Sequence, residues 1–208
     1  MSSATAAVAM AIFLATSSVA VRAESFDATA KRFIEEMAGE AINVITAGKI
    51  TEDERTTRFR KLLNENFAIH AIGRFVLGRY WRNASDAEQA EYLKLFEDFI
   101  VVTYVNRFAE YTGETLDVIQ AVQQGDEGDK DVLVRSEIKR PKGQPPIQVD
   151  WRVRSPNGRP LIVDVVVEGV SMSQTQRSEF GSVIKRGGDK VSVLLDALRQ
   201  KTASLQSQ

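Results

Sequence analysis

The stretch 147-IQVDWRVRSPNGRPLIVDVVVEGVSM-172 decides the fold class of this 208-residue chain. Apolar and polar residues alternate over 147–154 and again over 161–168, which predicts two strands with one buried face and one solvated face. The connection 155-SPNGRP-160 is short, and a short loop joins antiparallel neighbours because a parallel pair needs a longer crossover. The two segments therefore predict an antiparallel pair.

The residues on either side extend this pair to a larger sheet with helices. Segments 116–124 and 132–140 have strand-like patterns, and short loops rich in turn residues connect all four strands. Apolar residues spaced three and four apart predict amphipathic helices before and after the strands. These helices are expected at 26–44, from 51 onward, and at 67–81, 85–111, 173–186 and 189–203. The predicted fold class is α+β, an antiparallel four-strand meander packed against N-terminal and C-terminal helices.

The N-terminus differs from the rest of the chain. No charged side chain occurs from residue 1 to 21, and the apolar run 8–15 is too short to span a bilayer comfortably. Serine, threonine and then 21-VRA-23 follow, which is typical of a signal peptide and its cleavage site. We expect residues 1–23 to be a secretory signal peptide and 24–205 to be a single domain, so the mature protein is expected to be exported.

The composition excludes several classes of site. The chain has no cysteine, which rules out disulfides, thiolate metal sites and cysteine nucleophiles. Its net charge of −1 provides no overall field that favours nucleic acid. Several arginines lie near aromatic residues, but the neighbouring acids and the negative total predict solvated faces. These arginines are Arg74, Arg79, Arg82 and Arg107.

The run Gly169-Val170-Ser171 raises the alternative of a hydrolase, in which a strand–turn–helix elbow presents a nucleophilic serine. That elbow needs a second glycine after the serine, where this chain has Ser173. A serine also needs a base, and the one histidine, His70, lies far upstream in an apolar segment typical of a hydrogen-bonded core residue. We therefore expect Gly169 to permit a turn, the serines to cap the next helix, and the protein not to be an enzyme.

Two other motifs have structural explanations. The run 126-DEGDKD-131 lacks the spacing and final glutamate of an EF-hand loop, so it predicts a solvated hairpin tip. Asn83-Ala84-Ser85 matches the glycosylation triplet, but Ser85 is explained as a helix cap. No spacing singles out paired carboxylates, a phosphate loop or a metal site, so no catalytic residue, metal or cofactor is predicted.

The apolar residues exceed what one sheet face requires. One face lined by Val, Ile and Trp needs one covering layer, whereas the sequence supplies an apolar segment at 67–81, an aromatic face over 85–111 and further helices at both ends. Two interpretations stay open from the residues alone: the helices close a solid core, or sheet and helices enclose an apolar cavity. A cavity without catalytic groups in an exported protein favours binding of an apolar molecule.

Four segments are distinctive: 78-GRYWRNAS-85, 164-DVVVEGVSM-172, 177-RSEF-180 and 187-GGDKVSVLLDAL-198. Together they resemble the MlaC family of periplasmic phospholipid carriers, also called toluene-tolerance proteins, over residues 25–203. Many members have a tyrosine just before the arginine of the third segment, where this chain has Gln176. The resemblance implies an NTF2-like, MlaC-like fold whose pocket, between sheet and helices, holds the acyl chains of a glycerophospholipid.

The resemblance also implies partners and a cellular role. Such a carrier exchanges its phospholipid cargo with an inner-membrane MCE-domain protein and its ABC transporter, and with an outer-membrane lipoprotein. These transient contacts with membrane complexes maintain the lipid asymmetry of the outer membrane. A hopanoid-associated, HpnM-like role in the same superfamily is one alternative, and an exported adaptor or chaperone with a solid core is another.

Periodicity and the resemblance together predict a set of pocket-lining residues. The helices are expected to contribute Ile72, Phe75, Val76, Phe96, Phe99, Ile100 and Tyr104. The sheet is expected to contribute Val149, Trp151, Val153, Val163, Val165 and Val167.

Overall fold

The computed structural model describes residues 25–46, 50–108, 111–125 and 130–206. The predicted signal peptide and most of the predicted hairpin tip 126–131 lie outside these residues. The helices are α1 (Phe26–Thr46), α2 (Glu52–Asn66), α3 (Ile69–Leu77), α4 (Asp86–Phe108), α5 (Met172–Arg186) and α6 (Val191–Gln206), with 3₁₀ turns η1 (Gly78–Asn83) and η2 (Pro141–Gly143). The strands are β1 (Thr115–Gln123), β2 (Asp131–Lys139), β3 (Ile147–Arg154), β4 (Leu161–Val167) and β5 (Val170–Ser171).

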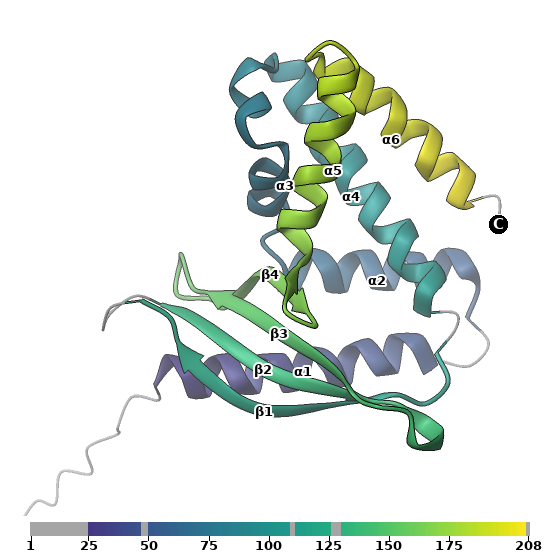
Figure 1. The fold of residues 1–208 in the computed structure, drawn as a ribbon. Helices are drawn as coiled ribbons and strands as arrows, with labels where there is room; N and C mark the ends of the chain where they lie inside the picture. The colour runs from purple at the N-terminus through teal and green to yellow at the C-terminus, as the bar shows by residue number, and fades with distance from the viewer. Residues whose placement is uncertain (1–24, 47–49, 109–110, 126–129, 207–208) are drawn as a thin grey trace, which may run out of the picture.

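The strands form one antiparallel sheet in the order β1-β2-β3-β4-β5, so the predicted four-strand meander is confirmed and extended by a two-residue fifth strand. Helix α1 lies along β1 and β2, whereas α3, α4, α5 and α6 pack on one another at the other end of the molecule (Figure 1). Helix α2 packs against both α1 and α4 and so joins the two parts. The fold is α+β, as predicted.

One face of the sheet is apolar because the register aligns the same side-chain rows across strands. Val149 lies opposite Val167, and Trp151 lies opposite Val165. A β-bulge follows, so that Ile162 rather than Val163 lies opposite Val153. Strict alternation over 161–168 is therefore wrong at this point, because the bulge shifts the parity of the strand by one residue.

The predicted helix caps are present at α2 and α4. Thr51 Oγ1 accepts a hydrogen bond from the Glu54 N–H at 3.1 Å. The Ser85 N–H donates to the Glu88 carboxylate at 2.9 Å, which completes a capping box. Each cap satisfies backbone groups that have no partner within the helix.

The helix predicted over 67–81 is shorter in the structure. Helix α3 ends at Leu77 because Gly78 adopts a φ of +60°, and the 3₁₀ turn η1 continues the chain. A Cβ at Gly78 would lie 3.0 Å from Arg177 Nε, so the glycine also allows α5 to approach closely. Gly78 thus allows Arg177 of α5 to lie beside η1.

Aromatic residues fill the interface between α4 and its neighbours. Tyr92 and Phe96 are buried, and both rings contact Phe180 of α5, at 6.4 and 6.3 Å between centroids. The Tyr92 hydroxyl donates to the Gly73 carbonyl of α3 at 3.0 Å. Burial raises the pKa of Tyr92, so its hydroxyl remains a donor.

No helix within the described residues has the length and apolar run needed to cross a bilayer.

Candidate functional site

The turn that resembles a nucleophile elbow is a β-hairpin followed by a helix cap. Glu168 and Gly169 connect β4 to β5 and both have positive φ, as the tightest hairpin loops require. Ser171 Oγ donates to Asp164 Oδ2 at 2.6 Å and accepts the Gln174 N–H at 3.1 Å. The prediction that a serine caps this helix is confirmed for Ser171, and the helix begins at Met172 rather than at residue 173.

His70 does not occupy the position expected of it. The predicted hydrogen-bonded core histidine is wrong, since His70 is exposed on α3. The apolar residues around it made the segment look buried on all sides, but α3 covers the core with one face only. Its buried residues are Ile69, Gly73, Val76 and Leu77.

The sheet residues predicted for the pocket lie mostly on one face. The cross-strand pairs place Val149, Trp151, Val165 and Val167 side by side, with Val153 next along the same face. Val149 and Val153 are buried, whereas Trp151 and Val165 are half-buried against the core. Val163 stands at the bulge, and Ile162 takes its place on the inner row.

The helix residues predicted for the pocket divide into three groups. Val76 and Phe96 are buried in the core. Phe75 is 39% exposed and lies beneath the Arg177 guanidinium, 4.8 Å from its ring centroid, so its surroundings are polar. The remaining residues are half-buried and pack against the same core cluster as Trp151 and Val165; they are Ile72, Phe99, Ile100 and Tyr104.

A buried serine holds the indole of Trp151 in place. Trp151 Nε1 donates to Ser136 Oγ at 3.0 Å, and Ser136 Oγ donates to the Val149 carbonyl at 2.6 Å. The sequence contains a signal for this residue, because Ser136 follows Val132 and Val134 at the spacing of two that places side chains on one face of a strand. All three side chains are buried in the structure. A polar side chain in such a row needs a partner, and the indole N–H supplies it.

The sequence prediction missed two further residues of this region. The alternation predicted over 161–168, with Val163 facing inward, puts Ile162 on the solvated face of β4. Ile162 is instead fully buried, and its carbonyl accepts the Ala68 N–H at 2.9 Å. Phe180 was noted for its motif but not as a packing residue. It touches Tyr92, Phe96 and Phe99, which brings α5 against the aromatic face of α4.

The sequence of this chain matches a known protein family over most of its length. Residues 35–200 match the model of the MlaC protein family, which is well over half of the chain. The chain belongs to the MlaC family. The resemblance inferred from the four sequence segments is thereby confirmed.

The MlaC fold is also found by structural comparison. The chain is similar to a phospholipid-binding protein from Ralstonia solanacearum, whose solved structure is in complex with a phospholipid. The TM-score is 0.72 at 22% sequence identity, and the match covers 85% of this chain and 98% of that one. At this identity the likeness establishes the shared fold.

Proposed function

We propose that this MlaC-family protein is a periplasmic carrier that binds the acyl chains of a glycerophospholipid between the inner face of the sheet and the helices. In this proposal it shuttles the lipid between an inner-membrane MCE-domain protein with its ABC transporter and an outer-membrane lipoprotein, and so maintains outer-membrane lipid asymmetry. Family membership and the phospholipid held by the Ralstonia solanacearum protein support lipid as the cargo.

The observation that carries the proposal is a set of half-buried apolar side chains on two elements that share one core cluster. Trp151 and Val165 belong to the sheet, and Phe99, Ile100 and Tyr104 belong to α4. Helix α4 packs mainly on α2, α3 and α6, whereas α1 covers β1 and β2. Leaving apolar surface in water costs roughly 25 cal/mol per Å², so acyl chains that cover these side chains are stabilised there.

The energetics also explain why a carrier needs no catalytic group. Burying one methylene is worth about 0.8 kcal/mol, so ~30 methylenes of two acyl chains amount to more than about 20 kcal/mol relative to water. Unassisted diffusion of a single lipid molecule through an aqueous compartment is therefore negligible. Since a bilayer and an apolar pocket offer similar surroundings, loading is close to balanced and the partners must set the direction.

Extraction of bound lipid tests the proposal directly. The mature chain, residues 24–208, is purified by gel filtration without detergent, incubated with liposomes of mixed phospholipid, re-isolated and analysed by mass spectrometry. We expect glycerophospholipid in stoichiometric amount. A hopanoid in its place would transfer the proposal to the HpnM-like alternative, and a protein that stays empty would support a solid core and an adaptor role.

A further inference from the structure

A groove of about 500 Å³ lies on the helical end of the molecule, where α3, η1 and α5 meet. Arginines dominate its lining: Arg74 from α3, Arg79 and Arg82 from η1, and Arg177 from α5. Among the residues that the structure describes, no acidic side chain belongs to this lining. The sequence predicted solvated faces for three of these arginines, Arg74, Arg79 and Arg82, and all three are exposed. The fold gathers them with Arg177 around one groove.

Most of the positive charge in this groove is uncompensated. Arg79 lies 3.9 Å from Asp189, a pair that is largely exposed. Within the described part of the chain, Arg74, Arg82 and Arg177 form no ion pair with a carboxylate. The chain as a whole has a net charge of −1, so this concentration of unpaired guanidinium groups is a local feature of the surface.

Aromatic rings hold three of the four groove arginines in place; the Arg79 guanidinium lies 4.8 Å from the centroid of Tyr80. The Arg74 guanidinium lies 5.5 Å from the centroid of Trp81, and that of Arg177 lies 4.8 Å from the centroid of Phe75. Arg177 Nη1 also donates to the Phe75 carbonyl at 3.3 Å. Stacked guanidinium groups lose little freedom on binding, and their outward N–H groups match carboxylates in pairs.

We propose that this arginine groove is the docking site for an acidic, extended segment of a partner protein, with carboxylates on the guanidinium groups and an apolar side chain against Phe75 and Trp81. The inference does not depend on the identity of the cargo. Apart from Phe75, none of the groove residues belongs to the predicted acyl-chain pocket.

The shape and composition of the surface favour a peptide over an anionic membrane. An interfacial membrane anchor presents a broad apolar face beside its basic residues, whereas the lining of this shallow groove consists of four arginines, two aromatic residues, an alanine and a glycine. The exposed ring of Phe75 lies beneath Arg177 and is not free to insert into lipid.

Fluorescence anisotropy of labelled peptides tests this site. The probes are short synthetic peptides that contain four acidic residues and one aromatic residue at varied spacings, each matched to a peptide with Asn and Gln in place of the acids. We expect the acidic peptides to bind and the neutral ones not to bind. Binding should weaken as salt rises from about 50 mM to about 300 mM because the contacts are exposed charges.

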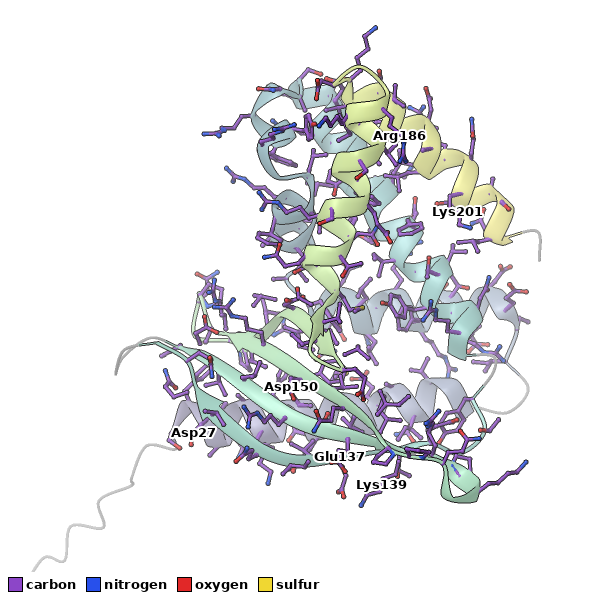
Figure 2. All side chains as sticks on the ribbon, viewed as in Figure 1. Asp27, Glu137, Lys139, Asp150, Arg186 and Lys201 are labelled. Atoms are coloured by element: carbon purple, nitrogen blue, oxygen red, sulfur yellow. The ribbon has the colours of Figure 1, made fainter. Side chains whose placement is uncertain are left out.

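Charge-matched variants locate the binding surface. Arg74→Gln with Arg82→Gln should weaken peptide binding at least about tenfold, since each charge-assisted hydrogen bond contributes roughly that factor. Lys139→Gln with Lys201→Gln removes the same charge from β2 and α6 (Figure 2), two elements that contribute no residue to the lining, and should change binding less than about twofold. Ala71→Trp should fill the groove, whereas Ala90→Trp, on exposed α4 surface, should not affect binding.

Three results would overturn the assignment. The first is equal binding of acidic and neutral peptides. The second is loss of binding in the control double variant to the same extent as in the groove variant. The third is binding to vesicles of phosphatidylglycerol, but to none of the peptides, that disappears in the groove variant. Lipid extraction from the same variants is a separate measurement, so failure of the carrier proposal is distinguished from failure of this one.

Discussion

Asp164 Oδ2 accepts a hydrogen bond from the Ser171 hydroxyl at 2.6 Å, which ties β4 to the start of α5. Asp164 Oδ1 also accepts the Ser173 N–H at 3.1 Å, so one carboxylate fixes the hairpin and the first turn of the helix. We predict that Ser171→Ala lowers the free energy of unfolding by about 1–3 kcal/mol, because it removes a helix cap and a charge-assisted hydrogen bond. Urea unfolding followed by circular dichroism measures the loss.

A double-mutant cycle with Asp164→Ala isolates this bond from the other effects of each substitution. We expect a coupling free energy of about 1–2 kcal/mol between the two sites. Strictly additive effects would show that the hydrogen bond makes no net contribution. A nitrophenyl ester serves as the chemical control, because turnover by the wild type that Ser171→Ala abolishes would restore the hydrolase interpretation.

Gly73 allows α3 to pack closely on α4. A Cβ at this position would lie 3.0 Å from Phe96 Cδ1 and 3.1 Å from Leu93 Cδ2. Phe96 is 2% exposed and packed among aromatic rings, so it has little room to move. We predict that Gly73→Ala destabilises the protein by about 1–3 kcal/mol through overpacking, despite the higher helix propensity of alanine.

Gly39 provides the matched control for Gly73. It also lies within a helix, α1, but a Cβ there would meet no atom within 4 Å. Gly39→Ala should therefore raise the free energy of unfolding by about 0.5–1 kcal/mol. Thermal unfolding of both variants checks the prediction, and an equal effect at the two positions would contradict the close packing of α3 on α4.

Asp131 on the outer sheet face makes stability depend on pH. Partial burial alone would raise the pKa of its carboxyl, but hydrogen bonds from Arg152 and Arg154, which pair with Oδ2 at 2.8 and 2.6 Å, override this and lower the pKa below 3.8. A lowered pKa stabilises the fold at pH values above the unfolded value and loses this effect as pH falls through the folded value. We predict that Asp131→Asn costs about 1 kcal/mol at neutral pH and progressively less below pH ~3.8.

Asp150 should respond in the opposite direction. Burial raises the pKa of its carboxyl, and the nearby charge of Arg135 only partly opposes this. The ionised form is thus disfavoured in the folded state, so Asp150→Asn should stabilise the protein at neutral pH and have less effect in acid, where the folded-state carboxyl is protonated. Asp150 lies on β3 of the same sheet as Asp131 (Figure 2). The two variants therefore compare carboxyls of one sheet whose pKa values are shifted in opposite directions. Urea unfolding midpoints of both variants and the wild type, measured from pH 3 to pH 7, test whether the two effects on stability have opposite signs.

Local patterns were sufficient to predict the element types and the meander. Alternation in β3 and β4, and short loops between strands, require antiparallel neighbours whatever the tertiary packing. The Thr51 and Ser85 caps depend on residues three positions apart, so they too can be inferred from the chain order.

Features that depend on partners far along the chain could not be predicted in this way. The bulge at Val163 is set by the register against β3, and it decides that Ile162 is buried. The exposure of His70 depends on which face of α3 meets the core. The arginine groove arises because Gly78 lets Arg177, a hundred residues away along the chain, lie against η1.

Val165 and Val166 offer a test of the proposed acyl-chain pocket. Val165 lies on the inner face opposite Trp151, whereas Val166 points to the other face and lies opposite Asp150. We predict that Val165→Trp reduces bound phospholipid at least about tenfold, since displacing even two methylenes costs about 1.6 kcal/mol. Val166→Trp adds the same side chain on the other face and should leave lipid occupancy unchanged.

The comparison is informative only for folded variants, so unfolding midpoints are measured together with the lipid extracted from each protein. Val165 is half-buried, so a larger side chain there can extend into a space that lipid would otherwise fill without strain on the core. A solid core predicts the reverse: Val165→Trp would overpack the protein and lower its stability, and lipid content would stay as it was. The two measurements together therefore separate a pocket from a filled core, because a pocket loses its lipid and keeps its stability.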